Sequence, residues 1–187
     1  VDDGSGDDTL VAGRTAARAA GLEGRTRFLR HRVNQGKTAA IVTAVRASDS
    51  PVLVLYDADL QHATDEIPRF LAAIDDGYDL VAGRKVGPYS KRFVSGIYNW
   101  LSRRIFRVPV RDLNSMKAFR REVVEDLPMR HDWHRFFVVM AFSRGYSVAE
   151  IDIRLHPRRA GTSKYTGRFR IISGLMDLAS VWFFLLF

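Results

Sequence analysis

The 187-residue sequence contains no cysteine, which excludes both a disulfide framework and catalysis by a thiolate. It also contains no internal repeat and no low-complexity tract. The apolar run at its C-terminal end, residues 181–187, has seven residues, whereas a helix that spans a bilayer needs about 20. With 47% hydrophobic residues, the chain has the length and composition of one globular domain with a substantial core.

Acidic residues are scarce in the second half of the chain. Residues 1–100 contain 13 basic and 13 acidic side chains, whereas residues 101–170 contain 16 lysines and arginines against seven acidic residues. The net charge of +8 therefore comes from the second half. A basic surface of this kind favours contact with nucleic acid, an anionic membrane or a phosphorylated substrate.

The stretch from residue 52 to residue 61 is the one around which the rest of the chain is organised. Residues 52–55 are aliphatic and follow a proline, which predicts a short buried strand. Asp57, Asp59 and Gln61 then follow at alternate positions, and alternate side chains on an extended backbone point to the same side. Two adjacent carboxylates repel each other unless a cation lies between them, and such oxygen ligands suit Mg2+ or Mn2+. A solvated acidic turn after a strand is the alternative explanation of the same spacing.

Helices and strands are expected to alternate in the first half of the chain. The sequence begins with Val-Asp-Asp-Gly-Ser, which is typical of a strand end and turn, so we expect a further strand and helix upstream of it. Hydrophobic periodicity and turn residues predict helices at residues 9–20, 38–47 and 65–76, and strands at residues 25–30, 52–55 and 78–84. This alternation indicates a mostly parallel sheet with helices on both faces.

Charged side chains gather where these strands end. In an open sheet of this kind, ligands bind outside the carboxyl ends of the strands. Three strand ends carry such residues, namely Asp2 with Asp3, Asp57 with Asp59, and Arg84. Charge at three separate strand ends favours a binding site over three unrelated surface turns.

The second half of the chain is more basic and less regular. Its pattern predicts helices at residues 90–106, 121–127 and 134–144, strands at residues 116–120 and 146–155, and a basic, turn-rich loop at residues 156–165. The loop contains a glycine and few apolar residues, which is typical of a segment that becomes ordered on binding a substrate.

Seven short motifs occur in a fixed order along the chain. They are VDDGS at 1–5, NxGK at 34–37, DADLQ at 57–61, GR at 83–84, DxxS at 112–115, HRF at 134–136 and RxxGxSKY at 158–165. Together they resemble the family-2 glycosyltransferases, and most closely the dolichyl-phosphate mannose synthase-like branch. The resemblance covers nearly the whole chain. It implies a glycosyltransferase-A (Rossmann-like) α/β fold with a mostly parallel central sheet, whose first strand and helix lie upstream of Val1.

The resemblance also implies a reaction. The enzyme would transfer a sugar from a nucleotide-sugar donor, GDP-mannose or a UDP-hexose, to a polyprenyl or dolichyl phosphate, with inversion at the sugar and with Mg2+ or Mn2+. The departing nucleoside diphosphate requires neutralisation of its negative charge, which a divalent cation supplies. Its implied donor residues are Asp2 and Asp3 for the base and ribose, Lys37 in the donor pocket, Asp57, Asp59 and Gln61 for the metal, and Arg84 for a phosphate.

The resemblance places a second group of residues on the acceptor side. Asp112 matches a carboxylate near the acceptor, and together with Asp59 it is the candidate for catalysis. A phosphate monoester has a second pKa of about 6 and is largely dianionic at neutral pH, so Asp112 is expected to orient the acceptor rather than remove a proton. A turn aspartate remains the alternative for Asp112. The residues implied for phosphate binding are Arg135, Arg158, Arg159, Ser163 and Lys164, with a simple helix start as the alternative for Arg135.

The C-terminal segment, residues 169–187, is expected to be an amphipathic helix at a membrane surface, following a catalytic domain at residues 1–168. Apolar residues recur there at helical spacing, and basic residues precede it. A polyprenyl tail stays in lipid, so the acceptor has to be met at the membrane surface. The nucleotide-sugar donor is expected on the cytoplasmic side, so we expect the enzyme at the cytoplasmic face of the membrane. A core helix packed on the sheet is the alternative.

Other functional classes account for less of the sequence. A nucleic-acid-binding module would use the basic second half and its aromatic residues, but it leaves the strand-end carboxylates unexplained, so no nucleic-acid partner is expected. A nucleotidyltransferase also uses paired carboxylates and a metal, but it does not predict the apolar C-terminal segment. A glycosyltransferase with a saccharide acceptor and an inactive relative remain further alternatives.

Overall fold

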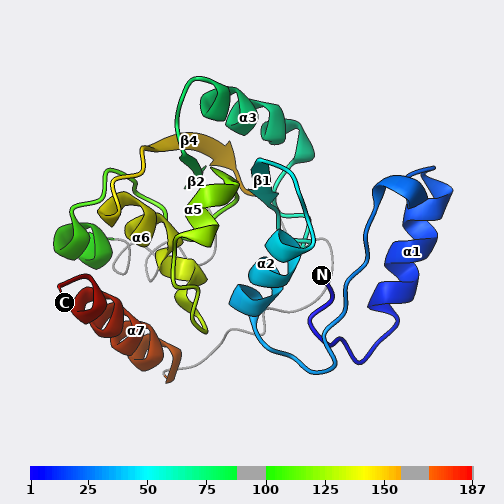
Figure 1. The fold of residues 1–187 in the computed structure, drawn as a ribbon, viewed down its shortest axis with the longest axis horizontal. Coiled ribbons are helices and arrows are strands. Elements are labelled where there is room, and N and C mark those ends of the chain that lie inside the picture. Colours follow the sequence, from blue (N-terminus) through cyan, green and yellow to red (C-terminus); the bar gives the residue numbers. More distant parts are fainter. Residues whose placement is uncertain (88–99, 157–168, 187) are drawn as a thin grey trace. The chain divides into compact units, whose positions relative to one another are not determined.

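The computed structural model describes residues 1–87, 100–156 and 169–186 (Figure 1). The chain divides into two compact units. The first unit consists of Val1–Asp49 and Pro128–His134, and the second unit consists of Ser50–Leu127 and Arg135–Phe187. Each unit is described separately below.

The first unit contains helix α1 (Thr9–Ala19), a 3-10 turn η1 (Glu23–Arg25) and helix α2 (Lys37–Arg46). Asp7 Oδ1 accepts the Thr9 N–H at 3.1 Å, which satisfies one of the free donors of the first turn of α1. Gly21, with φ +66°, ends the helix, as the sequence predicts. Both helices lie within one residue of their predicted bounds at either end.

The strand predicted at residues 25–30 is wrong. Residues 23–25 form the 3-10 turn, and the only bridge in this stretch is a single parallel one between Asp2 and Arg30. His31 N–H donates to Asp2 O, and Asp2 N–H donates to Leu29 O. Within the described residues, no further strand continues this pairing, and one bridge is too short to form a strand.

The second unit is built around a four-stranded sheet, shown in Figure 1 with its helices. Its elements are β1 (Val52–Leu55), η2 (Thr64–Glu66), α3 (Ile67–Asp75), β2 (Leu80–Val86), a helical segment at 100–106, β3 (Lys117–Arg120), α5 (Arg121–Glu125), α6 (Phe137–Ser143), β4 (Val148–Arg154) and α7 (Phe169–Leu186). A 3-10 turn, η3 (Trp133–Phe136), precedes α6. These positions confirm the predicted elements of this part of the chain that the structure describes. Residues 90–99, which make up most of the helix predicted at 90–106, and residues 157–168 lie outside the described residues.

The sheet is mixed, with strand order β1-β3-β2-β4. β3 is antiparallel to both β1 and β2, whereas β2 and β4 are parallel. It follows that β1, β2 and β4 all point the same way and that β3, inserted between β1 and β2, is reversed. The predicted α/β fold with largely parallel strands is confirmed, with this one reversed strand in its middle.

Helices cover both faces of this sheet. Phe70 and Ile74 of α3 pack with Val81 of β2 and Ala118 of β3 on one face. The next residue of β3, Phe119, meets Phe137 of α6 edge-on, with ring centroids 4.9 Å apart. Successive residues of a strand point to opposite faces, so α3 and α6 lie on opposite sides.

Helix α7 has one face in the core of the second unit and one face in solvent. Leu178 and Val181 are buried. Met176 and Phe183 are 66% and 61% exposed. Among the described residues, no helix has both the length and the apolar content needed to cross a bilayer.

Candidate active site

One edge of the sheet in the second unit collects the candidate site residues. β1, β2 and β4 end at this edge because they run the same way, and the reversed strand β3 begins there. The register aligns Leu55, the last residue of β1, with Lys117, the first residue of β3. The segments that follow β1 and precede β3, which contain Asp57, Asp59 and Asp112, therefore meet at one edge, as the sequence predicts for a ligand site.

The segment after β1 is a tight turn tied to the end of β4. Leu60 has a φ of +56°, which is uncommon for a residue with a branched side chain. Asp59 Oδ1 accepts the Gln61 N–H at 3.2 Å. The Gln61 side-chain NH2 donates to His156 O at 3.3 Å, and the His156 N–H donates to Gln61 O at 2.8 Å. The turn is therefore held both locally and through His156, the first residue of the predicted basic loop.

The donor set of this turn fits a hard divalent cation that completes its coordination with a substrate. Asp57 and Asp59 are half-buried carboxylates. The Gln61 amide nitrogen donates to His156 O, and its Oε1 is an oxygen of the kind that hard cations bind. Among the described residues, no group of three or more His, Cys, Asp or Glu side chains could hold a metal. Two carboxylates and an amide oxygen leave positions for diphosphate oxygens, as Mg2+ sites commonly do.

Arg84 lies at the end of β2 and pairs with β4. A Cβ on the preceding residue, Gly83, would lie 2.5 Å from Ile153 Cδ1, so a larger residue there would require the Ile153 side chain to shift. Arg84 donates from both Nε and a terminal nitrogen to the carboxylate of Asp152, and this hydrogen bonding holds the pKa of Asp152 below its ordinary value. Glu150 Oε2 lies 3.8 Å from Arg84 Nε. Arg84 therefore lies at the sheet edge where the sequence predicts it, and there it pairs with the carboxylates of Asp152 and Glu150.

Asp112 is a buried carboxylate beside the end of β2. Its residue is 5% exposed, and its Oδ2 lies 3.4 Å from Lys85 Nζ. Its Oδ1 accepts the Asn114 N–H at 3.0 Å, which is the turn geometry that the sequence left open. The backbone N–H groups of Arg111 and Asp112 donate to Glu150 Oε1. The turn role and a role toward an acceptor are compatible, because each oxygen of a carboxylate accepts more than one hydrogen bond.

The first unit contains three of the predicted donor residues, Asp2, Asp3 and Lys37. Asp3 Oδ1 lies 2.7 Å from His31 Nδ1 and accepts the Gln35 N–H at 2.9 Å, and its Oδ2 accepts the Gly36 N–H at 2.8 Å. Burial acts to raise the pKa of Asp3, but these hydrogen bonds outweigh it and hold the pKa below its ordinary value. Asp3 therefore organises the turn that leads into α2.

Asp2 and Lys37 are the other two predicted donor residues in the first unit. Asp2 Oδ1 accepts the Ser5 N–H at 3.0 Å, and hydrogen bonding with Ser5 holds the pKa of Asp2 below its ordinary value. Its Oδ2 lies 3.3 Å from Arg30 Nε, although among the described residues it accepts no hydrogen bond. Lys37 is the first residue of α2 and is half-buried.

The remaining predicted residues divide into two groups. Arg135 is half-buried in η3. Arg158, Arg159, Ser163 and Lys164 lie outside the described residues.

The sequence did not predict the residues that hold Asp3, Arg84 and Asp112 in place. Glu150 and Asp152 belong to a strand whose alternation is only approximate, and His31 follows directly after the strand predicted at residues 25–30. Lys117 is 2% exposed and donates to Ser115 O at 2.9 Å. The one sequence signal for such residues is a charged side chain inside a predicted strand.

Comparison with protein families gives the assignment of the chain. Residues 1–145 match the family model described as glycosyl transferase family 2. The chain belongs to this family. The family-2 resemblance inferred from the seven motifs is confirmed, and so is the prediction that the chain is a glycosyltransferase.

Several curated family-2 relatives are similar along nearly the whole chain. An uncharacterized glycosyltransferase of Mycobacterium tuberculosis is 32% identical, with 91% of this chain and 78% of the relative covered. The dodecaprenyl-phosphate galacturonate synthase of Rhizobium johnstonii is 31% identical over 99% of this chain and 56% of its own length. The undecaprenyl-phosphate 4-deoxy-4-formamido-L-arabinose transferase of Edwardsiella ictaluri is 30% identical over 96% of this chain and 56% of its own length. The chain thus spans just over half the length of these two polyprenyl-phosphate enzymes.

Solved structures confirm the glycosyltransferase-A-like fold. A mycobacterial protein superposes with a TM-score of 0.73 at 21% identity, covering 96% of this chain and 63% of that protein. Glucosyl-3-phosphoglycerate synthase from Mycobacterium tuberculosis, in complex with Mn2+ and UDP-glucose, superposes with a TM-score of 0.69 at 19% identity, covering 96% of this chain and 66% of that protein. At these identities the likeness concerns the fold.

Proposed function

We propose that this family-2 glycosyltransferase transfers a sugar from a nucleotide-sugar donor, GDP-mannose or a UDP-hexose, to a polyprenyl phosphate, with inversion at the sugar and at the cytoplasmic face of a membrane. The observation that carries the proposal is the shared edge at which β1, β2 and β4 end and β3 begins. It brings carboxylates suited to a metal to the same edge as Arg84, Lys85 and Asp112. The names of two relatives, which specify dodecaprenyl and undecaprenyl phosphate, support the acceptor class.

Asp57, Asp59 and Gln61 would hold Mg2+ or Mn2+ together with the donor diphosphate. When bound, the cation supplies charge neutralisation for the departing nucleoside diphosphate. The occurrence of Mn2+ and UDP-glucose in a protein of the same fold supports this role. Arg84 adds a planar guanidinium suited to phosphate oxygens, once it exchanges its present partner, Asp152.

The acceptor phosphate would meet Asp112 and its neighbours. A phosphate monoester is largely dianionic at pH 7, so its attack on the sugar does not depend on a strong general base. Asp112 lies beside Lys85 Nζ, at 3.4 Å, so the local charge is balanced. In this role Asp112 and Lys85 orient the acceptor, and Arg135 with the loop residues Arg158, Arg159, Ser163 and Lys164 neutralises its phosphate.

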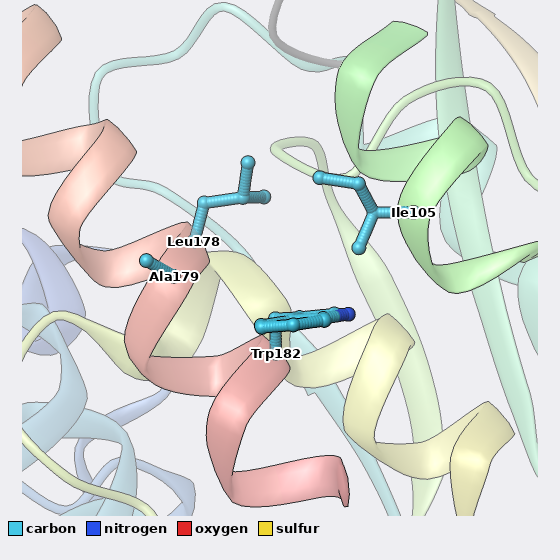
Figure 2. A pocket seen from close by; sticks show the side chains of 4 residues that line it. All are labelled: Ile105, Leu178, Ala179 and Trp182. Atoms are coloured by element: carbon cyan, nitrogen blue, oxygen red, sulfur yellow. The ribbon is translucent and has the colours of Figure 1, made fainter.

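The solvent-facing side of α7 supports a lipid acceptor. A hollow of about 410 Å3 is lined by Ile105 of the helical segment 100–106 and by Leu178, Ala179 and Trp182 of α7. Figure 2 shows Leu178 and Trp182 on the side of α7 that faces Ile105. The apolar side chains of Met176, Trp182 and Phe183 on α7 are 66%, 48% and 61% exposed. An apolar surface of this kind on a basic protein suits the headgroup boundary of an anionic bilayer.

A direct assay tests the proposal. The chain is incubated with radiolabelled GDP-mannose or UDP-hexoses and undecaprenyl phosphate in detergent, with Mn2+ or with EDTA, and lipid-linked sugar is extracted into organic solvent. We expect label in the organic phase with one donor class, dependent on Mn2+ or Mg2+. Label transferred only to saccharide acceptors would contradict polyprenyl phosphate as the acceptor. If no donor binds at all, the proposed transfer reaction is contradicted.

A further inference from the structure

Glu150 connects the two candidate substrate-binding groups of the second unit. Its Oε1 accepts two backbone N–H groups, those of Arg111 and Asp112, the second at 3.0 Å. Its Oε2 lies 3.8 Å from Arg84 Nε. The Glu150 side chain is 14% exposed, so water competes little for these contacts.

The sheet register gives Glu150 this position. Glu150 is aligned with Ala82 of β2, and Asp152 is aligned with Arg84. Glu150 and Asp152 are two residues apart on β4 and therefore share one face of the sheet. One carboxylate thus reaches the loop at residues 111–112, and the other holds Arg84.

The Asp112 loop is held at two points. Glu150 holds its backbone, and Lys85 holds its side chain through an ion pair at 3.4 Å. A carboxylate that accepts backbone N–H groups forms charge-assisted hydrogen bonds, which are stronger than neutral ones. Removal of Glu150 would leave the exposed Arg111 N–H and the partly buried Asp112 N–H without their acceptor. The loss at Asp112 costs free energy that a shift of the loop recovers.

We propose that Glu150 is a positioning residue that fixes Asp112 relative to Arg84, and so aligns the acceptor with the donor phosphate. Glu150 itself touches no substrate in this assignment. The inference rests on the proposed function for the role of Asp112, but the anchoring of the loop stands on the contacts of Glu150 alone.

Three variants of the full chain separate positioning from general stability. Glu150→Ala removes the acceptor of both N–H groups. Glu150→Gln keeps an oxygen that accepts them and removes the charge. Glu125→Ala is the matched control, because Glu125 lies in the same unit and forms an exposed ion pair with Arg121.

The variants are compared by amide hydrogen exchange at Arg111 and Asp112 and by the kinetics of sugar transfer. We expect Glu150→Ala to accelerate exchange at both amides and to lower kcat by about 10- to 100-fold, with the KM for the donor changed by less than about threefold. Glu150→Gln restores slow exchange and most of kcat, and Glu125→Ala matches the unaltered chain.

Two results overturn the inference. One is unchanged exchange at both amides in Glu150→Ala, and the other is an equal loss of kcat in Glu150→Ala and Glu150→Gln despite slow exchange in the latter. If the unaltered chain transfers no sugar, the proposed function fails, and the exchange comparison alone then decides whether Glu150 positions the loop. A folding defect in Glu150→Ala, seen as faster exchange throughout the second unit, leaves Glu150→Gln to decide through kcat.

Discussion

Gln61 and His156, 95 residues apart, hold each other through two hydrogen bonds. The His156 N–H donates to Gln61 O at 2.8 Å, and the Gln61 side-chain NH2 donates to His156 O at 3.3 Å. The turn that contains Asp57 and Asp59 is therefore attached to His156, the first residue of the basic loop predicted at residues 156–165.

Asp59→Asn tests the metal site. The variant keeps the shape of the side chain and removes its negative charge, so we expect loss of metal-dependent donor binding with little change in stability. Isothermal titration of UDP and GDP with Mn2+ or EDTA measures it, with the exposed Asp65→Asn as control. If neither EDTA nor Asp59→Asn changes the affinity for the donor, the assignment of the metal site is contradicted.

Arg158→Ala combined with Lys164→Ala tests the phosphate-binding loop. Each change removes a cation that would neutralise a phosphate, so transfer should fall by about tenfold or more. The melting temperature should change little, because the loop sequence offers few apolar contacts. Arg14→Ala, on α1 in the first unit, controls for loss of positive charge. An unchanged rate in the double variant refutes the loop assignment.

Gly4→Ala tests the turn that organises the Asp2 and Asp3 pair. Gly4 has a φ of +74°, and a Cβ there would lie 2.7 Å from the backbone carbon of Val33. Strain and close contact predict a loss of about 1–3 kcal/mol in the free energy of unfolding. Gly6→Ala is the control, since nothing lies within 4 Å of its Cβ position. Urea unfolding measures both, and equal stability of the two variants would argue against the strained turn.

The acid limb of stability should depend on Asp3. Burial opposes ionisation, but hydrogen bonds from Gln35, His31 and Gly36 hold the pKa of Asp3 below its ordinary value. The unfolded chain therefore binds more protons than the folded chain near pH 4, so this contribution is fully present above that pH and is lost as the pH falls through the folded pKa. Urea unfolding from pH 7 to pH 3 should show a steep acid limb that Asp3→Asn makes shallower. Parallel profiles for the two proteins would contradict this.

Met176→Ser combined with Phe183→Ser tests the membrane surface. Both side chains are mainly exposed, so the changes should lower binding to anionic liposomes in a flotation assay without lowering the melting temperature. Leu178→Ala is the contrasting variant, since Leu178 is 4% exposed and its truncation should destabilise the second unit by about 2–4 kcal/mol. If the unaltered chain never floats with liposomes, α7 is a core helix with an exposed apolar side.

The fold and part of the site could be predicted because their signals are local. The strand at residues 52–55 and the carboxylates at positions 57 and 59 follow from a short aliphatic run and a spacing of two. The helices α1, α2 and α3 follow from periodicity and from glycines such as Gly21 and Gly77 that adopt positive φ just beyond their ends. These features depend on residues within a few positions of one another.

By itself, the sequence determined most of the helices and strands, the position of Asp57 and Asp59 just after a strand, and the family. Only the tertiary structure decided that β3 runs backwards between β1 and β2, which brings Asp112 and Lys117 to the edge where Asp57 and Asp59 lie. It also decided that Arg84 pairs with Asp152, 68 residues away, and that residues 25–30 form one bridge instead of a strand. Strand direction and pairing depend on which surfaces are buried together across the whole chain. A local pattern contains no information about that distant partner.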